Sequence, residues 1–141
     1  MTVTIDNLPT AGPLIVDAAN VVGSVPDGWW RDRAGAAARL RDRLAAAVAA
    51  ATIPAAVEVV LVVEGAARGV EPVDGVRVVS APRSGDDTIV AVVREHVRDH
   101  DGPVTVVTAD RALRERVAAA GAAVIGPGAL RRWVDHEPGR G

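Results

Sequence analysis

The sequence contains no cysteine, lysine, phenylalanine or tyrosine among its 141 residues. Without cysteine, disulfide bonds, zinc knuckles, iron–sulfur clusters and thiol nucleophiles are excluded. Without lysine, the chain cannot be a P-loop NTPase, which needs a phosphate-binding lysine, or a Schiff-base enzyme. No apolar stretch reaches the roughly 18 residues that a membrane span needs, and the N-terminus has no secretory leader pattern. These absences predict a cytoplasmic protein that makes no contact with a membrane.

The residues that are present suit one compact domain. Hydrophobic residues make up 49% of the chain, enough to bury a core. All 16 basic residues are arginine, and the net charge of −2 excludes a strongly basic nucleic-acid arm but allows local basic patches. We expect a loose lead-in over residues 1–11, a single domain over 12–135 and a disordered tail over 136–141.

Short runs of valine, isoleucine and leucine alternate with longer amphipathic segments. The runs predict strands over residues 14–16, 57–63, 76–79, 104–107 and 122–125, and the segments predict helices over 31–51, 87–100, 110–120 and 128–134. Unbroken β-branched runs are typical of strands that are buried on both faces. The alternation therefore predicts an α/β fold with a mostly parallel sheet flanked by helices.

Acidic residues follow the predicted strands. Asp17 follows the first strand, Glu64 the second and Asp110 the fourth, while Asp86 and Asp87 begin the helix after the third. Because ligands bind beyond the carboxyl ends of parallel strands, we expect four segments to bring carboxylates to one edge of the sheet. Structural roles are the alternative: Asp86 and Asp110 could cap helices, and Glu64 could be a solvated turn residue.

Asp17 is the hardest of these acids to explain structurally. It ends a strand that should be central, where a buried carboxylate is costly unless it is paired or coordinated. Crowded carboxylates also repel one another, and a divalent cation removes that repulsion. Mg²⁺ and Mn²⁺ prefer oxygen ligands. We therefore predict a Mg²⁺ or Mn²⁺ site with Asp17, Asp86 and Asp110 as ligands, and hydrolysis of a phosphodiester as the reaction.

Further residues have predicted roles around these acids. Either Asp86 or Asp87 could hold a metal-bound water as the base, so both are candidate catalytic residues with Asp17 and Asp110. Arg83 and Arg111 are expected near the same edge, where guanidinium groups would contact substrate phosphates. Asn20 would orient a water or contact phosphate, or else stabilise a turn.

The tryptophans and histidines can also be explained by purely structural roles. Trp29 and Trp30 precede the first long helix, where they could pack as a hydrophobic staple or stack on a base. We expect Trp133 to lie in the core. His96 and His100 have a metal-compatible spacing but lie in a charged segment without a third ligand, which indicates a solvated surface.

Four stretches resemble the motifs of NYN domains, the PIN-like nucleases, and especially their YacP-like bacterial branch. They read LIVDAANVVG at residues 14–23, VLVVEG at 60–65, SGDDTI at 84–89 and VVTADRALR at 106–114, and the resemblance covers roughly residues 13–134. It implies a PIN-like Rossmannoid fold and a divalent-metal ribonuclease site. Asp17, Asp86 or Asp87, and Asp110 match the family's acidic metal-binding positions, and Asn20 matches its amide.

The sequence also departs from the family pattern. Ala18 and Ala19 replace the usual glycine and aromatic residue, and Glu64 stands where the family usually has aspartate. The resulting hypothesis is a Mg²⁺- or Mn²⁺-dependent endoribonuclease that acts on single-stranded or structured RNA. A non-catalytic RNA-binding module with a degenerate site and a metal-dependent nucleotide pyrophosphohydrolase are the alternatives. Participation of a ribosome, or of a second copy in a homodimer, is left open.

Overall fold

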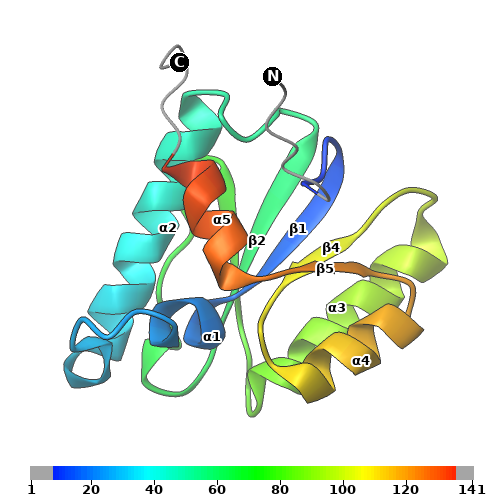
Figure 1. Cartoon of the computed structure of the whole chain (residues 1–141). Coiled ribbons are helices and arrows are strands. Elements are labelled where there is room, and N and C mark those ends of the chain that lie inside the picture. Colours follow the sequence, from blue (N-terminus) through cyan, green and yellow to red (C-terminus); the bar gives the residue numbers. More distant parts are fainter. Residues whose placement is uncertain (1–7, 136–141) are drawn as a thin grey trace.

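The sheet confirms the α/β class. The structure, a computed structural model, describes residues 8–135, so the expected tail at 136–141 and most of the lead-in lie outside the described residues. Five strands pair in the order β3-β2-β1-β4-β5, and every pair of neighbours is parallel (Figure 1). They are β1 (Gly12–Asp17), β2 (Val57–Val63), β3 (Val76–Ser80), β4 (Thr105–Val107) and β5 (Ala123–Ile125).

Helices cover both faces of this sheet. They are α1 (Ala18–Gly23), α2 (Arg33–Ala49), α3 (Gly85–Asp99), α4 (Arg111–Ala119) and α5 (Pro127–Val134), with short 3-10 turns η1 (Trp29–Arg31) and η2 (Gly65–Ala67). Buried side chains of α1, α2 and α5 form one apolar cluster with the sheet, and those of α3 and α4 form the other. Figure 1 shows these two helical layers on opposite sides of the strands.

The buried strands explain why two cores form. In β1, Leu14 and Val16 point into the first cluster while Ile15 points into the second, because successive side chains of a strand face opposite ways. Val60 and Leu61 divide in the same way in β2. Each of these side chains is at most 2% exposed, and burial of such a side chain stabilises the fold by about 1.5–3 kcal/mol.

Local capping interactions shift the helix boundaries from those predicted. The carboxylate of Asp32 accepts a hydrogen bond from the Gly35 backbone N–H at 2.9 Å, so α2 begins at Arg33. Ser84 caps α3, which therefore begins two residues before Asp87. The helix α1 is absent from the predicted elements, because its six residues are too few to show a helical period. Trp133 is 6% exposed in the core, as expected.

The strand order positions the end of β1. From β1 the chain proceeds outward to β2 and β3, and α3 then returns it to β4 on the other side of β1. The carboxyl end of β1 thus lies at the point where the winding of the sheet reverses, the usual place for a binding crevice in such sheets. Over residues 8–135, none of the helices has the length and apolar character that crossing a membrane requires.

Candidate functional site

Asp17 is a nearly buried carboxyl group at this reversal point. It is the last residue of β1 and the N-cap of α1, and it is only 6% exposed. Its Oδ1 accepts a hydrogen bond from the Asn20 backbone N–H at 3.3 Å, and its Oδ2 accepts one from the Thr108 hydroxyl at 3.0 Å. Burial raises the pKa of Asp17 to about 6, with smaller upward contributions from the charges of Asp86 and Glu64.

Thr108 connects Asp17 to Asp110. Thr108 is fully buried just after β4, and while its hydroxyl donates to Asp17 it accepts a hydrogen bond from the Asp110 backbone N–H at 3.1 Å. Asp110 is the N-cap of α4, and its Oδ1 accepts from the Leu113 backbone N–H at 2.9 Å. The predicted capping role and the placement at the sheet edge therefore both hold for Asp110. Thr108 is not among the predicted site residues, although its position as a hydroxyl residue directly after a buried strand is a usable signal.

Asn20 ties α1 to the loop that follows β4. Its side-chain Oδ1 accepts a hydrogen bond from the Ala109 backbone N–H at 2.8 Å. This bond fixes the loop of Thr108 and Asp110 against the first turn of α1. The structure therefore gives Asn20 a positioning contact, and its predicted contact with a phosphate or a water stays a prediction.

Glu64 and Asp86 complete the acidic edge. Glu64 follows β2, and its Oε2 accepts a hydrogen bond from the Gly85 backbone N–H at 2.6 Å, at the start of α3. Asp86 lies in the first turn of α3, and its pKa is raised by burial and then by the charges of Asp110 and Glu64. Glu64 could have been a solvated turn residue, but its charge acts on both Asp17 and Asp86. The fold thus brings four carboxylates into one electrostatic neighbourhood, which we call the acidic edge: Asp17, Glu64, Asp86 and Asp110.

Asp87 has a different environment from its neighbour. Its carboxylate forms an ion pair with Arg116 of α4 at 3.0 Å, and its side chain is 73% exposed. The sequence left open whether Asp86 or Asp87 faces the site. The shared electrostatics favour Asp86, because Asp87 is engaged in a pair between the two surface helices.

The chemistry of the acidic edge fits a hard divalent cation that keeps part of its water shell. Within residues 8–135, no three Asp, Glu or His side chains lie close enough together to hold one ion directly. However, Mg²⁺ commonly takes only one or two protein carboxylates and keeps several waters. Burial is the main cause of the raised pKa of Asp17 and of Asp86, and the negative charges of neighbouring acids add to both shifts. Oxygen ligands of this kind suit Mg²⁺ or Mn²⁺.

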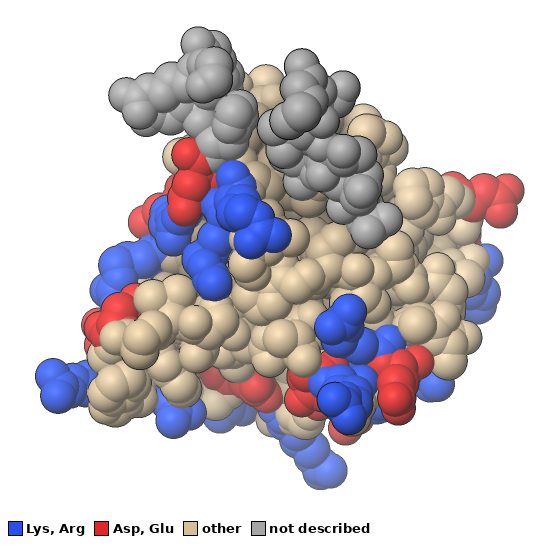
Figure 2. Space-filling view, viewed as in Figure 1, with Lys and Arg blue, Asp and Glu red and all other residues tan. Residues whose placement is uncertain are grey.

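Arginine side chains surround this edge. Arg83 lines a cavity of about 300 Å³ that also contains Glu64, and Arg111 is exposed on the first turn of α4, next to Asp110. Figure 2 shows acidic and basic side chains intermixed over α4. His96 and His100 stack on each other, with ring centroids 4.5 Å apart. They line a hollow with Gly12, at the opposite end of β1 from Asp17, so they take no part in the acidic edge.

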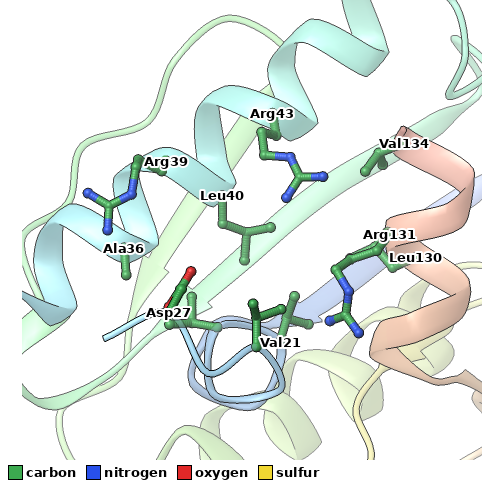
Figure 3. A pocket seen from close by; sticks show the side chains of 11 residues that line it. Val21, Asp27, Ala36, Arg39, Leu40, Arg43, Leu130, Arg131 and Val134 are labelled. Atoms are coloured by element: carbon green, nitrogen blue, oxygen red, sulfur yellow. The ribbon is translucent and has the colours of Figure 1, made fainter. Parts of the chain in front are cut away.

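A second cavity, of about 240 Å³, lies between α1, α2 and α5 (Figure 3). Its apolar floor includes Val21 and Leu40, and arginine side chains surround it. Arg131 donates a hydrogen bond to the hydroxyl of Ser24, and Arg43 pairs with Asp135. These two arginines are therefore held by partners of the chain itself.

Comparison with known proteins agrees with the fold. Residues 14–140 match the family model described as the YacP-like NYN domain. Crystal structures of Rae1 (YacP) from Bacillus subtilis are similar to this chain. The W164L mutant has a TM-score of 0.71 at 18% identity, covering 88% of this chain and 75% of that one. A second structure of the same protein has a TM-score of 0.67 at 19% identity, covering 86% and 72%. No curated protein sequence matches the chain.

Proposed function

The chain belongs to the YacP-like NYN domain family, which is a nuclease-type family, and from this premise we propose that it is a Mg²⁺- or Mn²⁺-dependent endoribonuclease. The proposed reaction is hydrolysis of an RNA phosphodiester bond at the acidic edge. A bound cation would polarise the phosphate and stabilise the leaving oxygen. The substrate is single-stranded or structured RNA, and the proposal needs neither a ribosome nor a second copy of the chain.

The residues divide into acids that hold the cation and groups that orient them. Asp17, Asp86 and Asp110 would hold it, directly or through water, and Glu64 would add negative charge beside them. The hydroxyl of Thr108 fixes the direction of one Asp17 oxygen. Arg83 and Arg111 would contact phosphates of the RNA, because guanidinium groups donate paired hydrogen bonds to phosphate oxygens.

The observation that carries the proposal is the hydrogen-bonded connection between Asp17 and Asp110. The Asp17 carboxyl at the end of β1 and the Asp110 backbone N–H at the start of α4 both bond one buried hydroxyl, that of Thr108. The charges of Asp86 and Glu64 act on Asp17, and those of Asp110 and Glu64 act on Asp86. A purely structural hydroxyl bridge would not need neighbouring acids whose charges raise the pKa of Asp17 and of Asp86. Such crowding is tolerated where a positive ligand compensates it.

An RNA cleavage assay with Mn²⁺ tests the proposal. We expect Asp17→Asn and Asp110→Asn each to lower the cleavage rate by at least about 10-fold, because loss of a group that only orients a metal ligand already costs about 10- to 100-fold. The control is Asp99→Asn, because Asp99 is exposed at the end of α3 and pairs only with its neighbour Arg98 among the described residues. Full activity in both site variants would contradict the proposal.

The absence of three directly convergent ligands within the described residues favours one alternative, a non-catalytic RNA-binding module. This alternative predicts that RNA binds but that no cleavage depends on Mn²⁺. Nucleoside triphosphates incubated in parallel test for a pyrophosphohydrolase. Release of pyrophosphate from them, with RNA left intact, would replace the ribonuclease assignment.

A further inference from the structure

The cavity of about 300 Å³ beside the acidic edge, which we call the Trp29 cavity, has no role in the chemistry described above. It lies between the first turn of α1, the N-terminal part of α2 and η2. Most of its wall is apolar, formed by small alanine side chains and the ring of Trp29, and its polar groups are Glu64, Arg33 and Arg83. Its volume is at the lower end of the roughly 300–1,000 Å³ typical of small-molecule pockets, which is room for one compact group.

The Trp29 ring is a fixed flat surface in this cavity. It is half-buried, and the edge of Trp30 packs against it with ring centroids 6.0 Å apart at 87°. The Arg33 guanidinium lies over the Trp29 ring, 5.3 Å from its centroid. An indole ring that lines a cavity is a suitable platform for another aromatic ring.

Glu64 connects the Trp29 cavity to the acidic edge. Its carboxylate lines the cavity, and its Oε2 accepts a hydrogen bond at 2.6 Å from the backbone N–H of Gly85, the residue before Asp86. Ala18, which directly follows Asp17, forms another part of the wall. An occupant of the cavity would therefore lie next to a phosphate held at the acidic edge.

The charges around the cavity fit a nucleotide. Arg33 and Arg83 are both exposed and line its wall, so they can meet backbone phosphates while the apolar wall meets a base. The cavity of Figure 3 lacks this combination, because no aromatic side chain lines it. Stacking on an aromatic ring beside basic groups is how proteins hold single-stranded RNA.

We propose that the Trp29 cavity is a base-binding subsite, in which the base next to the scissile phosphate stacks on Trp29 while Arg33 and Arg83 contact the flanking phosphates. This inference rests on the proposed cleavage of RNA at the acidic edge. It goes further by requiring an unpaired base at the cleavage position, since only an unstacked base can enter a cavity. Duplex RNA would be a poor substrate.

Fluorescence of the full chain tests the subsite without cleavage. The sequence has three tryptophans and no tyrosine, so emission comes from Trp29, Trp30 and Trp133 alone. The probes are a short RNA oligonucleotide and a fully abasic ribose-phosphate chain of the same length, both titrated in EDTA. We expect RNA to quench the emission and to bind about 10-fold more tightly than the abasic chain, since each stacked base adds measurably to affinity.

Variants then locate the binding. Ala19 is exposed on α1 and lines the cavity, so Ala19→Leu fills it with a good helix former and should reduce RNA affinity to that of the abasic chain. Trp29→Phe keeps an aromatic platform and should retain the preference for bases, while Trp29→Leu should lose it. Trp30→Phe is the matched control, because Trp30 is 52% exposed and does not line the cavity. Thermal melts establish that each variant is folded.

Equal affinity for RNA and the abasic chain would overturn the subsite, as would unchanged RNA binding by a folded Ala19→Leu variant. Cleavage in Mn²⁺, measured on the same variants, separates this result from the proposed function. Base-dependent quenching without any cleavage would support the subsite and contradict the nuclease. Cleavage at an unchanged rate in the Ala19→Leu variant would support the nuclease and contradict the subsite.

Discussion

At the residue scale, ionisation of the buried Asp17 lowers the free energy of unfolding, and the size of this loss depends on pH. Its folded pKa of about 6 exceeds the ordinary value of 3.8, so the folded chain holds this proton more tightly than the unfolded chain does. Below pH 3.8 both states are protonated, and no cost arises. As pH rises to 6, the unfolded state ionises first and stability falls, reaching a loss of about 3 kcal/mol above pH 6.

Asp17→Asn removes this cost, because an amide does not ionise. In EDTA, we expect the variant to gain free energy of unfolding relative to the natural protein at pH 7.5, by up to about 3 kcal/mol, and to gain much less at pH 4. Urea denaturation at the two pH values measures the difference. Asp42→Asn is the control, because the Asp42 side chain is 62% exposed on α2. An equal gain at both pH values would show that ionisation is not the cause.

Thr108 allows a second test, because its hydroxyl lowers the pKa of Asp17 by donating to it. Thr108→Val keeps the shape but removes this bond and leaves the partly buried Asp110 N–H without its side-chain acceptor. We expect unfolding free energy to fall by about 1–3 kcal/mol and the acidic limb of the cleavage profile to move to higher pH. Thr108→Ser keeps the hydroxyl and should restore the profile, which a packing effect alone would not explain.

Sequence patterns could predict some of these residues but not their contacts. Asp17 and Asp110 come at or just after the ends of buried strands, so their position at the sheet edge can be predicted from the sequence alone. The reach of Glu64 to the backbone of Gly85 is not, because those residues are 21 positions apart and meet only after β3 has paired with β2. Thr108 looked ordinary, since its importance lies in bonding Asp17 across 91 positions.

At the scale of elements, α3 separates two adjacent acids onto different faces. Residues next to each other on a helix point about 100° apart, so Asp86 turns toward the acidic edge while Asp87 meets Arg116 of α4. We expect Asp86→Asn to lower Mn²⁺-dependent cleavage by about 10- to 100-fold. Asp87→Asn should cost far less activity, and at most about 1 kcal/mol of stability for its exposed ion pair.

Cleavage rates of the two variants, measured side by side, decide which acid faces the substrate. A third variant, Arg116→Gln, breaks the same ion pair from α4 and should match Asp87→Asn in both activity and stability. If Asp87→Asn proved the more damaging acid substitution, the assignment of the two acids would have to be exchanged.

Element types were predictable where the hydrophobic period was long. The predicted bounds of β2 are correct, because its apolar pattern extends over seven consecutive residues. Helix ends shifted by one or two residues, since caps such as Asp32 and Ser84 decide where hydrogen bonding begins. The short helix α1 depends on the Asp17 cap and on packing of Ala18 and Val21, which no local period reveals.

For the whole molecule, the contact between β1 and β4 joins the two halves of the sheet. Gly12, at the start of β1, has φ +84°, and a Cβ there would lie 2.1 Å from the Pro103 carbonyl oxygen. Gly12→Ala therefore adds a backbone collision to the cost of a positive φ. Gly69 is the matched control, because its φ is +92° and a Cβ there would meet nothing within 4 Å.

We expect Gly69→Ala to lose about 1–2 kcal/mol of unfolding free energy from φ alone. Gly12→Ala should lose clearly more, and should also reduce cleavage, because separation of β1 from β4 pulls Thr108 away from Asp17. Chemical denaturation and the cleavage assay on both variants measure this. Equal losses would mean that the chain relaxes around position 12 without strain.

The overall architecture was partly predictable. Runs of valine and leucine buried on both faces indicated a mostly parallel sheet, and the structure confirms this class. The strand order was not predictable from those runs, because a right-handed crossover permits the fourth strand to join either edge. Only the paired structure shows that β4 lies beside β1, which places Asp110 near Asp17.

The return of the chain through α3 means that the acidic edge is assembled from segments that come before and after this helix in the sequence. During synthesis, Asp17, Glu64 and Asp86 emerge from the ribosome before the β4 segment that carries Thr108 and Asp110. A nascent chain that stops short of β4 has no hydroxyl to hold Asp17 and no Asp110. A translation product that ends before β4 therefore lacks the complete acidic edge, and the proposed nuclease becomes active only after the β4 segment has been synthesised.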